Sequence, residues 1–191
     1  MAINMKNVNV NVNVKTNLLS IVYVAMFAAV ITICAQIQIP ATVPFTLQTL
    51  GVFVAAGMLG WKRGTLSVLV YILLGLVGLP VFAGFTGGVG VLFGLTGGYI
   101  IGFLFTAFIV GIMSEKLGRK LWVLAVSMVL GLLACYVFGT AWFMVIYNTS
   151  MGSMSLVTAL GMCVVPFLPF DALKIAAAVV LVNRLSKIVR L

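Results

Sequence analysis

The sequence predicts an all-α integral membrane protein that crosses the bilayer six times, as three helical hairpins. Of its 191 residues, 64% are hydrophobic and only 7% are charged, whereas about a quarter are charged in a typical soluble domain. Charged residues are absent from three long blocks, 16–61, 64–114 and 121–170. One spanning helix needs about 20 residues, so each block is long enough for two. Because lipid satisfies no backbone polar group, we expect each block to fold as a pair of helices.

Each uncharged block has a break near its middle, rich in residues that end helices. The breaks are a segment with glutamines and prolines at 36–48, a glycine-rich segment at 79–90 and a polar segment at 147–155. Such residues interrupt helices for known backbone reasons. The predicted helices are 18–38, 46–61, 64–79, 94–114, 121–147 and 156–186. Residues 1–16 contain an Asn-Val alternation and predict a flexible cytoplasmic tail, and 17–191 form a single transmembrane domain.

Basic residues determine the predicted orientation. Ten of the eleven precede the first predicted helix, separate the hairpins or follow the last helix, so they fall on one side of the membrane: Lys6, Lys15, Lys62, Arg63, Lys116, Arg119, Lys120, Arg184, Lys187 and Arg190. The three breaks carry no basic residue. The positive-inside rule therefore predicts a multi-pass protein of the cell membrane with both termini in the cytoplasm. The net charge of +9 follows from this topology and gives no reason to expect nucleic-acid binding.

Composition gives little basis for metal, cofactor or enzyme chemistry. The chain has no histidine, the commonest general base and metal ligand. Cys34, Cys135 and Cys163 stand alone in apolar stretches without metal or disulfide spacing. An intramembrane enzyme would need a nucleophile with a base, or a metal site. We therefore predict no metal, no cofactor and no enzymatic activity.

The eleventh basic residue, Lys174, lies inside the last predicted helix, three residues after Asp171. At 1.5 Å per residue the two lie roughly 14 Å and 18 Å deep, near the bilayer centre. The spacing puts both on one helix face, where they can pair. Pro166 and Pro169 precede them, and irregular backbone at this depth is tolerated where it is buried in protein or lines a cavity. The pair predicts the wall of a polar pocket, and the alternative is a structural ion pair that fixes helix packing.

Two further features have a packing and a functional interpretation. The apolar, glycine-rich loop 79–90 is a candidate lid over a ligand. Gly90, Gly94, Gly98 and Gly102 recur every four residues, which predicts close helix contact. On the first helix, Ala25 and Ala29 form a patch of small residues, which contacts either another helix of the same chain or a partner membrane protein.

These features together resemble the BioY family, the biotin-binding S-components of energy-coupling factor transporters. The resemblance covers about 18–190 and is carried by four runs: QIQIPATVPFTLQTLGVFVAAGMLG at 36–60, GLVGLPVFAGFTGG at 75–88, GLTGGYIIGF at 94–103 and PFLPFDALKIAAA at 166–178. It implies a six-helix, S-component-like fold that captures biotin with high affinity near the outer face. It also implies association with a transmembrane coupling subunit and two ATPase subunits, with Ala25 and Ala29 on the docking surface.

For biotin, we expect Asp171 to accept from the urea N–H groups, with Lys174 holding Asp171 ionised. Aromatic side chains near the outer side are candidates to pack on the apolar ring: Phe85, Tyr99, Trp142 and Tyr147. The ligand carboxylate is expected near Gln48 or the N–H groups of Gly87 and Gly88. An S-component for another vitamin, or a stand-alone carrier or channel, remains the alternative function.

Overall fold

The computed structural model describes the backbone of residues 5–188 and the side chains of residues 18–188. It is almost entirely helical, and the elements follow in this order: α1 (Met5–Gln36), β1 (Gln38–Ile39), β2 (Phe45–Thr46), α2 (Gln48–Leu76), α3 (Val89–Leu92), α4 (Gly97–Lys116), α5 (Leu121–Ser150), α6 (Leu156–Cys163), the 3-10 turn η1 (Val165–Phe167) and α7 (Leu168–Ile188). Within this part of the chain, five helical segments are long and apolar enough to cross a membrane: Leu18–Gln36, Gln48–Leu76, Gly97–Lys116, Leu121–Ser150 and Leu156–Ile188. The predicted helical fold, with several helices apolar enough to span a membrane, is therefore confirmed.

Helix α2 covers most of two predicted spans, 46–61 and 64–79, and bends sharply at Gly60. Gly60 has φ 77° and ψ −174°, far from helical values. A Cβ on Gly64 would lie 2.7 Å from the Cα of Ala56, although eight residues of straight helix span about 12 Å. The two arms, 48–59 and 61–76, therefore fold back against each other at a glycine hinge.

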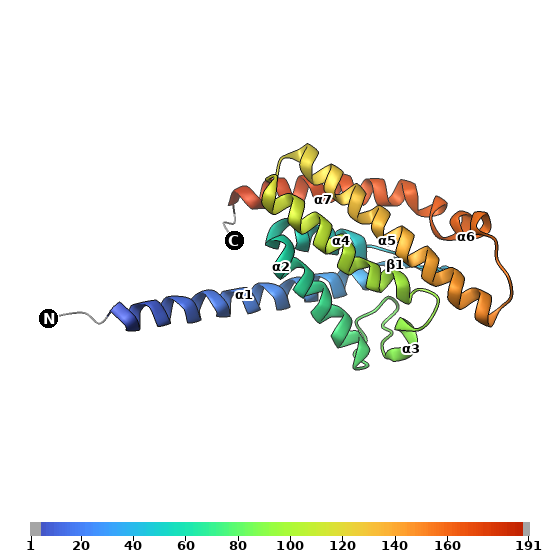
Figure 1. Cartoon of the computed structure of the whole chain (residues 1–191), viewed down its shortest axis with the longest axis horizontal. Coiled ribbons are helices and arrows are strands. Elements are labelled where there is room, and N and C mark those ends of the chain that lie inside the picture. The colour runs from blue at the N-terminus through green and yellow to red at the C-terminus, as the bar shows by residue number, and fades with distance from the viewer. Residues whose placement is uncertain (1–4, 189–191) are drawn as a thin grey trace.

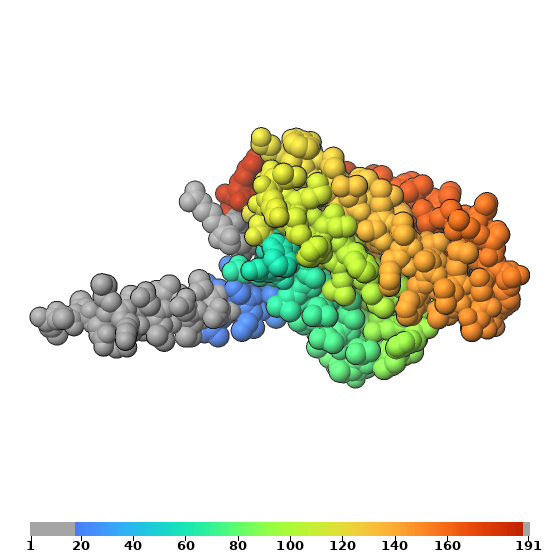
Figure 2. Space-filling model, viewed as in Figure 1, coloured from blue at the N-terminus to red at the C-terminus, as the bar shows by residue number. Residues whose placement is uncertain are grey.

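Helices α4 and α5 pack closely side by side, as the glycine spacing predicts (Figure 2). A Cβ on Gly98 would lie 2.2 Å from Trp142, and one on Gly102 would lie 2.9 Å from the Cys135 sulfur. Helix α5 contributes Gly139, where a Cβ would lie 2.2 Å from the Tyr99 ring. Glycines on both helices thus let large side chains of the partner approach the backbone.

The last predicted helix, 156–186, is divided into α6, η1 and α7. Val164 has φ −124° and ψ −57°, and Pro166 follows in the first turn of η1, where its missing N–H is tolerated. Because of this break, a new helix, α7, begins just before Asp171 and carries it in its first turn.

At the other end of the chain, α1 begins at Met5, so the segment predicted as a flexible tail is helical from that residue on. Neither Gly nor Pro occurs between residues 5 and 36, and extending a formed helix is far easier than starting one. Residues 1–4 of the predicted tail lie outside the described residues.

The first predicted break contains a short β-hairpin, which the sequence did not predict. Gln38 pairs with Thr46 and Ile39 with Phe45 in an antiparallel ribbon. The Phe45 ring stacks on Phe167 with 4.1 Å between centroids. The hairpin is thereby fixed against the segment that leads into α7.

The hinge of α2, the α4–α5 connection and α7 meet at the end of the bundle where Figure 1 also places the C-terminus. The Arg119 guanidinium donates to the carbonyl oxygens of Gly57 at 2.9 Å and Met58 at 2.6 Å. The amide of Asn183 on α7 donates to the carbonyl oxygen of Arg119 at 2.9 Å. This Arg119 bridge satisfies carbonyl groups that the end of the first arm leaves free.

Candidate functional site

A cavity of about 120 Å³ lies at the opposite end of the bundle from the Arg119 bridge. Its walls come from the β-hairpin, the start of α2, the loop after α2, α4, α5 and the α6–α7 region. They consist of Val43, Pro44, Thr46, Gln48, Thr49, Phe82, Ala83, Thr86, Val91, Thr96, Tyr99, Ile100, Phe103, Leu132, Cys135, Tyr136, Cys163, Phe167, Asp171 and Lys174. A second, more open hollow of about 180 Å³ lies across the hairpin and shares Thr46 and Lys174 with the cavity. The first is the better candidate because it encloses most of the buried polar side chains of this end.

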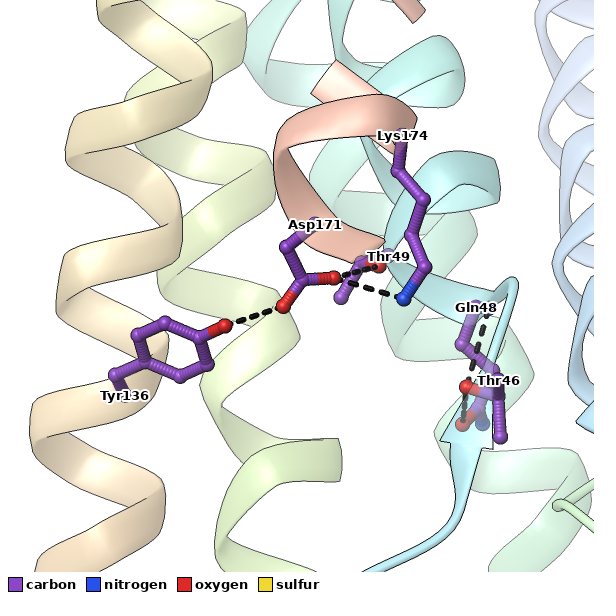
Figure 3. A network of polar contacts seen from close by, with 6 residues as sticks. All are labelled: Thr46, Gln48, Thr49, Tyr136, Asp171 and Lys174. Carbon is purple, nitrogen blue, oxygen red and sulfur yellow. Dashed lines mark hydrogen bonds and ion pairs between the residues drawn. The ribbon is translucent and has the colours of Figure 1, made fainter. Parts of the chain in front are cut away.

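Asp171 is the polar centre of the cavity (Figure 3). It is 2% exposed, and Lys174 is 9% exposed. The Lys174 ammonium donates to Asp171 Oδ1 at 2.7 Å, and the Thr49 hydroxyl donates to the same oxygen at 3.3 Å. The Tyr136 hydroxyl donates to Oδ2. Helices α2, α5 and α7 thus each supply a group to one carboxylate, which fixes its orientation.

A second polar chain runs beside this centre. Thr46 donates to Gln48 Oε1 at 2.8 Å, and Gln48 Nε2 donates to the Tyr71 hydroxyl. The Tyr71 ring contacts Phe82 edge-on, with 5.5 Å between centroids. Gln48 therefore connects the hairpin to the second arm of α2 and, through Tyr71, to the loop that covers the cavity.

The loop after α2 closes the cavity through residues 82–86. Phe82 is buried at 1% exposure, and its ring fills the space beside Gly75, where a Cβ would lie 2.0 Å from the ring. Phe82 and Thr86 form an isolated antiparallel bridge, and Phe82, Ala83 and Thr86 face the cavity. The predicted lid position of this loop is consistent with this placement.

Four of the nine predicted ligand-binding residues line the cavity, namely Gln48, Tyr99, Asp171 and Lys174. The Tyr99 hydroxyl is hydrogen-bonded to the Thr140 hydroxyl at 3.0 Å, which holds the ring in place. Gln48 is committed to Thr46 and Tyr71 and is therefore less available to a ligand than the sequence suggests. The charged pair lines the cavity, as the sequence predicts for the wall of a polar pocket.

The other five predicted residues do not line the cavity. Phe85 is 72% exposed, and Gly87 packs against the carbonyl oxygen of Leu79. Gly88 ends the loop beside Gly75, to whose oxygen it donates at 2.7 Å. Trp142 donates to the carbonyl oxygen of Gly94 at 3.1 Å, and Tyr147 stacks on Phe143. The aromatic residues were chosen for closeness to the outer face and the glycines for their N–H groups, and neither criterion tells which residues face the cavity.

Sequence reasoning missed Tyr136 and Thr49, the other two partners of Asp171. A depth comparison finds Tyr136: it is fifteen residues into α5, or about 22 Å, and Asp171 is seventeen residues from the end of α7, or about 25 Å. Thr49 directly follows Gln48 at the start of α2. A carboxylate paired with an ammonium, inside walls of apolar and aromatic side chains, is suited to a small molecule with hydrogen-bonding groups and an apolar ring.

Comparisons with known proteins point to one group. The family model of the BioY family matches residues 5–191. A biotin transporter BioY of Thermotoga maritima is 43% identical over 164 residues, covering 85% of this chain and 93% of that protein. A probable biotin transporter BioY of Pyrococcus horikoshii is 40% identical over 166 residues, covering 85% and 93%. A crystal structure of the S-component for biotin from an ECF-type ABC transporter superposes with a TM-score of 0.80 at 31% identity, covering 91% of this chain and 93% of that one.

Proposed function

Because the chain belongs to the BioY family, we propose that it is the biotin-binding S-component of an energy-coupling factor transporter, with biotin held in the cavity around Asp171. The observation that carries the proposal is the buried Asp171–Lys174 pair in the cavity wall, where no other lining residue is charged. An ion pair at this depth is a poor source of stability. Its position in the wall of a cavity supports a binding function instead. The relatives are named transporters, which supports transport over catalysis.

The urea group of biotin can use the hydrogen-bonding positions that Asp171 and Lys174 still have free. An ionised carboxylate has about four acceptor positions, and Thr49, Lys174 and Tyr136 occupy three at Asp171. One urea N–H therefore donates to the remaining position on Oδ2. Lys174 uses one of its three N–H groups on Asp171 and donates another to the urea oxygen. Each charge-assisted bond contributes about 1.5–3 kcal/mol.

The remaining parts of biotin fit the rest of the wall. Its thioether ring packs on aromatic side chains, of which Tyr99 is the predicted member and Phe82 and Phe103 are additional ones. Its carboxylate lies toward Thr96, which lines the cavity beside the N-terminus of α4. A helix N-terminus favours negative charge. This placement replaces both predicted ones: the amide of Gln48 already has two partners, and Gly87 and Gly88 do not line the cavity.

Six spans with both termini in the cytoplasm remain the topology that we propose. The two arms of α2 supply two spans on either side of the Gly60 hinge. Lys62, Arg63 and Arg119 lie near the hinge end of the bundle, so the positive-inside rule puts that end in the cytoplasm. The cavity then opens toward the outer face, where biotin is captured.

Delivery of biotin requires the transmembrane coupling subunit and two ATPase subunits that the family resemblance implies. Ala25 and Ala29 are both exposed on α1, which supports contact with a partner protein over contact with another helix in the described part of the chain. Small residues on a lipid-facing helix let a partner helix approach closely. The patch is therefore the docking surface that we propose for the coupling subunit.

Isothermal titration of the detergent-purified, ligand-stripped protein with biotin tests the binding function, with riboflavin and thiamine as competing vitamins. We expect tight binding of biotin alone, at one site per chain. Asp171→Asn removes a charged acceptor and should weaken binding by one to two orders of magnitude, about 1.4–2.8 kcal/mol.

Glu115→Gln is the matched control, since it makes the same change at the one other acidic residue, at the hinge end. It should bind biotin like the wild type. Wild-type affinity in Asp171→Asn would mean that the ion pair is structural. Selective binding of riboflavin or thiamine would assign the chain to another vitamin, and transport by the chain alone in liposomes would favour a stand-alone carrier.

A further inference from the structure

The side chain of Gln36, the last residue of α1, holds the loop that covers the cavity. Its Nε2 donates to the loop carbonyl oxygens of Val81 at 3.3 Å and Phe82 at 3.1 Å, and a longer contact of 3.4 Å joins it to the carbonyl oxygen of Thr32 on α1. Its Oε1 accepts from the backbone N–H of Phe85 at 2.9 Å. One carboxamide thus binds both ends of the segment 81–85, which is more than forty residues away in sequence.

The segment that Gln36 holds also lines the cavity. Phe82 and Ala83 line the cavity, and both fall within the stretch that Gln36 bridges. The Phe82 ring is anchored beside Gly75 and Tyr71, but Phe85 is exposed and has φ 56°. The tip of the loop therefore has an apolar anchor at Phe82 and depends on Gln36 at Phe85.

The contact needs a group that donates and accepts at once. A carboxylate only accepts, an ammonium only donates, and a carboxamide does both. We propose that Gln36 is a positioning residue whose carboxamide holds the loop closed over the cavity and thereby slows the exit of bound ligand. The part concerning ligand exit rests on the proposed biotin-binding function, and the part concerning the loop does not.

Gln36→Glu is the sharpest test, because it keeps the size of the side chain and replaces its donor by a second acceptor facing two carbonyl oxygens. Gln38→Glu is the matched control. It adds the same charge two residues away, and among the described residues the Gln38 side chain makes no hydrogen bond to the loop, although it lies beside Gly84. Gln36→Met removes both hydrogen-bonding functions without adding charge, and serves if Gln36→Glu does not fold.

Hydrogen–deuterium exchange of the ligand-free protein measures the loop directly. We expect the peptide containing Phe85 to exchange about tenfold faster in Gln36→Glu and Gln36→Met than in the wild type or Gln38→Glu, since its amide loses its acceptor in the Met variant and its loop is displaced in the Glu variant. Unchanged exchange in both Gln36 variants would overturn the proposal. This result is obtained whether or not the chain binds biotin.

The dissociation rate of radiolabelled biotin measures the consequence for the ligand. We expect it to rise about tenfold in both Gln36 variants and to stay unchanged in Gln38→Glu. Faster loop exchange with unchanged dissociation would show that this loop does not control exit, and would overturn that part of the proposal. Failure of the wild type to bind any biotin would refute the proposed function and leave the exchange result to decide the role of Gln36.

Discussion

Asp171 receives hydrogen bonds from three helices, and of the two partners that the sequence did not predict, Thr49 and Tyr136, only Tyr136 reaches Oδ2. The Tyr136 hydroxyl is the partner of Oδ2, whereas Thr49 and Lys174 share Oδ1. Without it, Oδ2 would lose its partner in a residue that is 2% exposed. A hydrogen bond to a buried charged group contributes about 1.5–3 kcal/mol, so this hydroxyl matters to the carboxylate's orientation.

Tyr136→Phe should therefore weaken biotin binding by about tenfold or more and lower the melting temperature of the ligand-free protein. Titration calorimetry and thermal unfolding in detergent measure the two effects. Tyr147→Phe is the control: its ring stacks on Phe143, and among the described residues its hydroxyl makes no hydrogen bond. If both variants behave alike, the Tyr136 hydroxyl has no special role.

The sequence identified the residues whose charged side chains cost free energy to place inside the bilayer. Asp171 and Lys174 stand out because a charge near the bilayer centre needs a reason. Tyr136 and Thr49 do not stand out, since an amphipathic ring or a hydroxyl is ordinary in a spanning helix. Trp142 and Tyr147 were chosen by type and approximate depth, but which face of α5 meets the cavity is decided by packing on α4, through contacts such as that of Gly139 with Tyr99.

At the scale of elements, the hinge of α2 depends on one glycine in a conformation that other residues rarely adopt. Gly60 combines φ 77° with ψ −174°, a region that is essentially reserved for glycine. The following N–H, on Trp61, donates to Glu115 of α4 at 3.3 Å. The charges at 62 and 63 predicted a break here, but the turn geometry was not predictable from them.

Gly60→Ala should destabilise the fold by about 1–3 kcal/mol, because its Cβ adds backbone strain and would lie 2.5 Å from the Glu115 carboxylate. Gly118→Ala is the control, with φ 85° and no atom within 4 Å of its new Cβ. Thermal unfolding in detergent should give the lower melting temperature for Gly60→Ala. Equal melting temperatures would show that the contact with Glu115 does not matter.

At the scale of the whole molecule, the cavity residues Thr49 and Asp171 lie at the starts of α2 and α7, whereas the Arg119 bridge contacts residues further along the same two helices. Part of α1 stands apart from the other helices (Figure 1). The sequence predicted the membrane class and the positions of most helices, since these follow from hydrophobicity and charge. It did not predict the β-hairpin or the helical residues 5–16, whose structures depend on contacts with Phe167 and on extension from α1.

The exposed face of α1 gives a prediction for the assembled transporter. Ala25→Trp should block biotin uptake in cells that contain the coupling module, because a large ring prevents close approach of a partner helix. Isothermal titration should show that the purified Ala25→Trp variant binds biotin as tightly as the wild type. Val129→Trp, at an exposed position of α5, is the control and should transport normally. Loss of binding and uptake together in Ala25→Trp would mean that this face supports the fold.

The position of Lys174 three residues after Asp171 on the same helix also bears on how the chain enters the bilayer. A charge at the centre of a spanning helix adds about 2.5–3.5 kcal/mol to the free energy of insertion. A partner on another helix could reduce this only after both helices had been inserted and assembled. With both residues on α7, the pair forms as soon as that helix does, so α7 enters the bilayer with Asp171 and Lys174 already paired.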